Sequence, residues 1–82
     1  MTTVELTREE LVGEPEPRKL ATGKNIISFN VRVSEKIENL NSGHKFDYQS
    51  GLYEIMNREP VDAPVKYVKF NCVQQIVNSA NG

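Results

Sequence analysis

The alternating stretch from Ile27 to Val33 constrains the fold more than any other part of this chain. Every second side chain is apolar and those between them are polar: Ile27, Phe29, Val31 and Val33 against Ser28, Asn30 and Arg32. Because successive side chains of a strand point to opposite faces of a sheet, this period of two predicts a strand with one buried face and one wet face. The chain is therefore expected to be a sheet protein.

Turn residues and weaker alternation surround this strand. Residues 4–12 alternate weakly and predict a first strand, with a short helical turn at Arg8–Leu11 as the alternative. Pro15 and Pro17 each lack a backbone donor and favour extended geometry before them, so the strand must end or bend there. Gly23 predicts the turn that leads into the alternating stretch.

The second half of the chain predicts a hairpin, a strand and a helix. Residues 46–56 resemble a hairpin whose turn is Ser50-Gly51, and residues 65–70 predict another strand. From Asn71 the period changes, because Val73, Ile76, Val77 and Ala80 follow helical spacing, which predicts a last helix of about 72–80. The expected fold class is thus mainly β, with one short C-terminal α-helix.

Length and composition set the scale of the protein. A chain of 82 residues allows one domain, 1–82, with a core so small that we expect a homo-oligomer. No apolar run is long enough for a membrane span, and the acidic start MTTVELTREE predicts no secretory signal. The single cysteine, Cys72, cannot form an internal disulfide, so we expect a cytoplasmic protein.

Charge is unevenly distributed along the chain, although the net charge is only −1. Residues 1–17 hold one arginine and five glutamates, a local charge of −4, whereas residues 18–47 hold six basic and three acidic side chains, a local charge of +3. A basic middle section predicts a positive stripe on the surface of a nearly neutral protein. The alternative is that these charges serve only solubility.

Two motifs resemble a known family. The first is Pro15-Glu16-x-Arg18, then Gly23, then Phe29-x-Val31-x-Val33, and the second is VKFNCVQQI at residues 68–76. In order and spacing they are similar to the N-terminal and middle part of the bacterial single-stranded DNA-binding proteins. The resemblance implies a small OB-like antiparallel barrel or partial barrel. The chain departs from the family pattern by lacking any tryptophan, the family's last two strands and its acidic tail.

The resemblance also implies a function, the sequence-independent binding of single-stranded DNA in replication, recombination or repair. Such binding needs aromatic faces for base stacking and cations along the phosphate path. The candidate nucleic-acid-binding residues are Arg18, Lys19, Lys24, Arg32, Lys45, Phe46, Tyr48, Tyr53, Lys66 and Phe70. Tyr67 and Lys69 belong to the same aromatic and basic set. For Phe70 and Tyr67 the alternative is a place in the core, and one of the pair Phe46 and Tyr48 can equally pack inward.

Other functional classes were weighed against this one. The main alternative is a protein-interaction or structural module of OB-like fold, such as an accessory or mobile-element protein, without DNA binding. We expect no enzyme, because the one histidine, His44, lies in a polar loop and Cys72 is best explained as a buried structural residue. One histidine and one cysteine do not make a zinc site. We therefore expect no cofactor, metal or small-molecule substrate.

Overall fold

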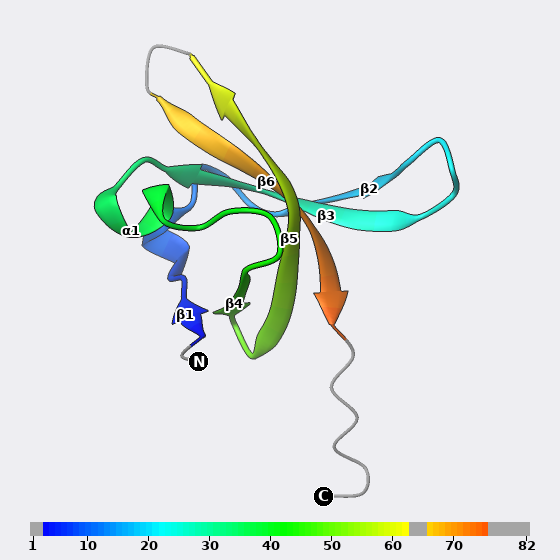
Figure 1. Cartoon of the computed structure of the whole chain (residues 1–82), viewed down its shortest axis with the longest axis horizontal. Coiled ribbons are helices and arrows are strands. Elements are labelled where there is room, and N and C mark those ends of the chain that lie inside the picture. Colours follow the sequence, from blue (N-terminus) through cyan, green and yellow to red (C-terminus); the bar gives the residue numbers. More distant parts are fainter. Residues whose placement is uncertain (1–2, 63–65, 76–82) are drawn as a thin grey trace, which may run out of the picture.

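The computed structural model describes residues 3–62 and 66–75, which form one sheet of six strands in the order β1-β4-β5-β6-β3-β2 (Figure 1). The elements in chain order are β1 (Val4–Glu5), η1 (Arg8–Glu10), β2 (Glu16–Lys19), β3 (Asn25–Arg32), α1 (Glu35–Glu38), β4 (Lys45–Tyr48), β5 (Gly51–Val61) and β6 (Tyr67–Gln75). All neighbouring strands are antiparallel except β1 and β4. The sheet is not closed within these residues, so the prediction of a mainly β, partial-barrel fold is confirmed.

The alternating stretch forms β3, and its apolar side chains supply the centre of the core. Phe29 and Val31 are fully buried, and Phe29 lies directly opposite Phe70 of β6. The Phe29 ring packs edge-on against Phe46, with ring centroids 5.1 Å apart. The prediction that Val33 is buried in this strand is wrong, because Val33 is 44% exposed and lies beyond the last residue of β3.

The predicted hairpin is formed by β4 and β5, with its turn one residue earlier than expected. Tyr48 pairs with Gly51, which leaves Gln49 and Ser50 as the two turn residues, both with positive φ (46° and 68°). Such a turn follows the right-handed twist of the strands it joins. Gly51 has another role: a Cβ atom there would lie 2.9 Å from the Tyr53 ring, so a larger residue would force that ring to move.

A bulge in β5 divides this long strand into two parts. Ile55 faces Cys72, but the next pair along the strands is Asn57 with Asn71, so Met56 is an extra residue in β5. An extra residue reverses which side chains point to which face. As a result Arg58 turns toward the core side, where its Nη1 donates to the Leu40 carbonyl oxygen at 2.7 Å.

The helices differ from those that the sequence predicted. Helix α1 was not predicted; Ser34 caps it by accepting a hydrogen bond from the Ile37 backbone N–H at 3.3 Å. The predicted helix of about 72–80 is wrong over residues 72–75, which continue β6, and its remainder lies outside the described residues. Neither helix in the described part of the chain is long and apolar enough to cross a membrane.

The N-terminal segment follows the alternative prediction rather than the first one. Residues 4–12 do not form one strand: β1 contains two residues, and the helical turn occurs at Arg8–Glu10. The prolines lie in or next to β2, an end strand of the sheet that pairs only with β3. An end strand tolerates Pro17, because a missing backbone donor on its free side breaks no ladder hydrogen bond.

Candidate nucleic-acid interface

Three of the aromatic candidates lie in the core and offer no face to a base. Phe46 and Phe70 are fully buried and Tyr48 is 5% exposed. The reason is the period of two. Every second residue of β6 points inward, namely Val68, Phe70 and Cys72, and so do Phe46 and Tyr48 on β4. All five side chains pack in one core with Phe29. The predicted stacking role of Phe46, Tyr48 and Phe70 is therefore corrected to core packing, and for Phe70 this is the alternative that the sequence had left open.

Tyr53 occupies an intermediate position at the edge of this core. Its ring centroid lies 4.8 Å from that of Phe29 and 5.8 Å from that of Phe46. Burial, with smaller contributions from the nearby Tyr48 and Cys72, raises the pKa of the Tyr53 hydroxyl. Tyr53 thus remains a neutral, partly exposed ring whose main contacts are with the core.

Four of the six predicted cations lie at separate places on the surface. Lys19 and Lys24 are exposed on the arm formed by β2, β3 and their connecting turn, which extends to one side in Figure 1. Lys45 is exposed on β4, in the other half of the sheet. Lys66 is exposed just before β6. The structure does not bring these four side chains together into one site.

The other two predicted cations, Arg18 and Arg32, point to the side of the sheet opposite the core. We call this side the outer face, and it is formed by Glu16 and Arg18 of β2, Ile26, Ser28, Asn30 and Arg32 of β3, Asn57, Glu59 and Val61 of β5, and Tyr67, Lys69 and Asn71 of β6. Along each strand these residues alternate with those that point into the core, and their cross-strand partners point to the same face. The bulge at Met56 is what places the β5 residues on this face.

Near the end of β3, the outer face combines cations with an aromatic ring. Arg32 is exposed and lies directly opposite Tyr67, a half-buried side chain. The next row along the strands pairs Lys69 with Asn30 on one side and with Glu59 on the other. Neither Arg32 nor Lys69 forms an ion pair within residues 3–62 and 66–75. Both cations are therefore available to an anionic ligand beside the Tyr67 ring.

Further along the outer face, a polar network joins four strands. The Ser28 hydroxyl, fully buried, donates to Asn71 Oδ1 at 2.8 Å, and Arg18 Nη1 donates to the same oxygen at 3.4 Å. Asn71 Nδ2 donates to Asn57 Oδ1 at 2.7 Å and to Glu59 Oε2 at 2.6 Å. Asn71 is thus hydrogen-bonded through both ends of its amide, which fixes its orientation. The expectation that Ser28 faces solvent is wrong, because the network covers it.

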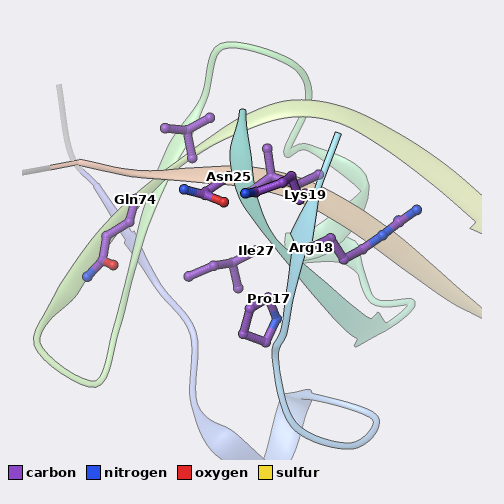
Figure 2. A pocket seen from close by; sticks show the side chains of 8 residues that line it. Pro17, Arg18, Lys19, Asn25, Ile27 and Gln74 are labelled. Carbon is purple, nitrogen blue, oxygen red and sulfur yellow. The ribbon is translucent and has the colours of Figure 1, made fainter. Parts of the chain in front are cut away.

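Hollows lie on both sides of β2. The larger, of about 600 Å³, is lined by apolar Pro17, Ile27 and Val73 with Lys19 and Gln74 at its rim. In Figure 2 the Lys19 side chain extends toward Gln74, whereas that of Arg18 extends the opposite way. This alternation separates the predicted cations of β2 between two surfaces.

A smaller hollow of about 170 Å³ lies beside the polar network. Arg18, Asn57, Glu59 and Asn71 supply its polar groups, and Leu20, Ile26 and Met56 supply its apolar ones. Its residues come from β2 and the residue after it, and from β3, β5 and β6. The hollow therefore forms where the β2–β3 hairpin meets the β5–β6 hairpin. The sequence does not signal this site, because its residues are separated by up to 53 positions and are brought together only by strand pairing.

The only histidine and the only cysteine of the sequence, His44 and Cys72, both have structural roles. His44 Nδ1 accepts a hydrogen bond from the Asn41 backbone N–H at 2.8 Å, which closes a turn. Cys72 is fully buried, and burial raises the pKa of its thiol to about 12. Within the described residues, no three His, Cys, Asp or Glu side chains are grouped so that they could hold a metal ion.

Comparisons with protein-family models, with curated proteins and with solved structures found no significant match to this chain. The similarity to the bacterial single-stranded DNA-binding proteins therefore rests on the two motifs alone. The assignment of a function has to come from the residues of the outer face.

Proposed function

We propose that this protein binds single-stranded DNA through the outer face, performs no chemistry on it, and serves in replication, recombination or repair. The observation that carries the proposal is the arrangement of Arg32, Tyr67 and Lys69, which places two cations without ion-pair partners in the described structure beside a half-buried ring. Cations neutralise phosphates, and an aromatic ring stacks on a base of any sequence.

The neighbouring residues extend the proposed interface along the sheet. Lys66 lies just before Tyr67, beside a hollow of about 390 Å³ that Val33 and Val61 also line. At the other end of the outer face, Arg18 adds a third arginine or lysine to Arg32 and Lys69 on the same side of the sheet. Glu59 and Glu16 interrupt this series, so the path carries three cations and two carboxylates. Such a path gives a moderate affinity for single-stranded DNA, and this affinity falls as the salt concentration rises.

One observation favours the alternative function, a protein-interaction or structural module. Three of the five aromatic residues predicted for stacking are buried, which leaves only Tyr67 and Tyr53 partly exposed. In addition, β1 and β2 each have one unpaired edge within the described residues, and a free edge can pair with another chain. Pairing of this kind would also join two copies of this protein, as the small core leads us to expect.

The experiment that separates the two functions is a titration of a labelled oligo-dT with the protein at several salt concentrations. We expect binding at low salt that weakens steeply as salt rises, with the slope of log K against log salt set by the number of phosphate contacts. Replacing Arg32→Ala is expected to reduce that slope by about one phosphate contact, roughly 0.7 in the slope for a single strand.

A matched control is available in Arg8→Ala. Arg8 lies on η1, and its ion pair with Glu14 joins two side chains that are 69% and 77% exposed, so its loss removes one positive charge without affecting the outer face. If Arg8→Ala and Arg32→Ala change the slope equally, the interface is not the outer face. If the wild-type protein binds oligo-dT no better than an unrelated acidic protein, the proposed function is wrong.

A further inference from the structure

We infer that the smaller hollow beside the polar network receives one guanine base of the bound strand, so that binding carries a preference for guanine over thymine. This inference rests on the proposed function and adds a base-selective position to it. The hollow lies on the outer face, on the same side of the sheet as Arg32 and Lys69, so a strand that follows these cations passes its opening.

The size and walls of the hollow suit a single flat base. Its volume of about 170 Å³ corresponds to roughly six water molecules at about 30 Å³ each, the scale of one nucleobase. Leu20, Ile26 and Met56 give apolar surface on which a base can pack. Met56 is the extra residue of the bulge and is 36% exposed, so its flexible side chain can cover an inserted ring.

The polar side of the hollow presents a carboxylate in a fixed position. Glu59 Oε2 accepts the Asn71 Nδ2 hydrogen bond at 2.6 Å, whereas Glu59 Oε1 has no hydrogen-bond partner within residues 3–62 and 66–75. Asn71 is itself held by Ser28 and Asn57, so the carboxylate is oriented before any ligand arrives. A ligand with two adjacent donors is the natural partner of a carboxylate that still has acceptor sites.

Among the bases, guanine has the matching edge. Its ring N1–H and amino group are adjacent donors that can bond one carboxylate in parallel, and its O6 atom is an acceptor. Asn57 Nδ2 and the remaining N–H groups of Arg18 line the same hollow and can donate to such an acceptor. Thymine offers a single N–H between two carbonyl oxygens, which a carboxylate repels. Adenine and cytosine each place an acceptor next to their amino group and are intermediate.

The test compares a labelled oligo-dT of about twelve nucleotides with the same oligonucleotide carrying one central guanine, adenine or cytosine. Binding is measured by fluorescence anisotropy for the wild-type protein, for Glu59→Gln and for Glu9→Gln. Glu9 is exposed on η1 and is the control for the same change of charge. We expect the guanine to tighten wild-type binding about tenfold, as a bidentate contact does, and Glu59→Gln but not Glu9→Gln to abolish this gain.

Each outcome bears on the inference separately from the proposed function. Equal affinity for all four oligonucleotides overturns the guanine site and leaves DNA binding in place, whereas no binding to any of them overturns both. A guanine preference that survives in Glu59→Gln places the selective position elsewhere and overturns the assignment. In the wild-type protein, the side-chain amide signals of Asn57 and Asn71 must shift on addition of the guanine oligonucleotide, and signals that stay in place also overturn it.

Discussion

Phe70→Ala should destabilise the protein severely, because the Phe70 ring is fully buried in the core. The ring contacts Phe46, with centroids 6.3 Å apart, and the Arg58 guanidinium lies 5.8 Å from its centroid. Truncation of a buried phenylalanine costs about 3–5 kcal/mol of unfolding free energy. A chain of 82 residues has a total stability of roughly 4–12 kcal/mol at about 0.05–0.15 kcal/mol per residue. The substitution therefore removes a large share of the total.

The assay is a pair of melts, one thermal and one in urea, for the wild-type protein, Phe70→Ala and Tyr67→Ala. At about 6 °C per kcal/mol for a domain of this size, Phe70→Ala lowers Tm by roughly 18–30 °C or leaves the chain unfolded. Tyr67 is the matched control, because it is an aromatic residue on the same strand that points to the outer face. We expect Tyr67→Ala to lower Tm by only a few degrees and to weaken oligo-dT binding by about 1–3 kcal/mol.

The two variants make the reasoning refutable in both directions. If Phe70→Ala melts like the wild-type protein, the ring is not part of the core and the assignment of faces along β6 is wrong. If Tyr67→Ala melts normally and binds oligo-dT with wild-type affinity, the ring does not stack on a base, and the outer face loses its aromatic contact.

Two further predictions concern groups on the core side of the sheet. Arg58→Met should cost about 1.5–3 kcal/mol, the usual value of a hydrogen bond from a charged group, because Arg58 Nη1 donates to the carbonyl oxygens of Leu40 and Glu38 at 2.7 and 3.3 Å. Hydrogen exchange should show α1 losing protection first, and uniform loss across the sheet would contradict this role. Burial raises the pKa of Cys72 to about 12, so at about pH 8 its thiol stays protonated and should react with iodoacetamide only as fast as the protein unfolds. Rapid alkylation of the native protein would show that the thiol is accessible.

Local patterns were sufficient for much of the fold. The period of two from residue 27 to residue 33 predicted β3 and its buried side chains Phe29 and Val31, although not the exposure of Val33, since alternation is a property of a single strand. The hairpin of β4 and β5 was predicted within one residue of its turn. The mainly β fold class followed from these segments, and the partial barrel followed from the family resemblance.

The errors arose where pairing with distant strands outweighed a local pattern. Residues 72–75 lie where the helical spacing begins, but Cys72 pairs with Ile27 on one side and Ile55 on the other. Residues 73–75 continue the ladder with β5, and this pairing holds the segment extended. Helix α1 was not predicted, because a four-residue helix has too little periodicity and depends on Ser34 and on contacts with Arg58.

The sequence by itself determined that the chain carries strand-forming segments, a basic middle section and enough aromatic residues for a small core or a stacking surface. It could not decide which aromatic residues pack in the core and which lie on the surface. The alternation of residues 67–70 places Tyr67 and Lys69 on one face and Val68 and Phe70 on the other, without saying which face is buried. Tertiary structure decided this through the register that sets Phe70 opposite Phe29. It also created the network around Asn71, since hydrogen bonds among Ser28, Asn71 and Glu59 need three strands to lie side by side.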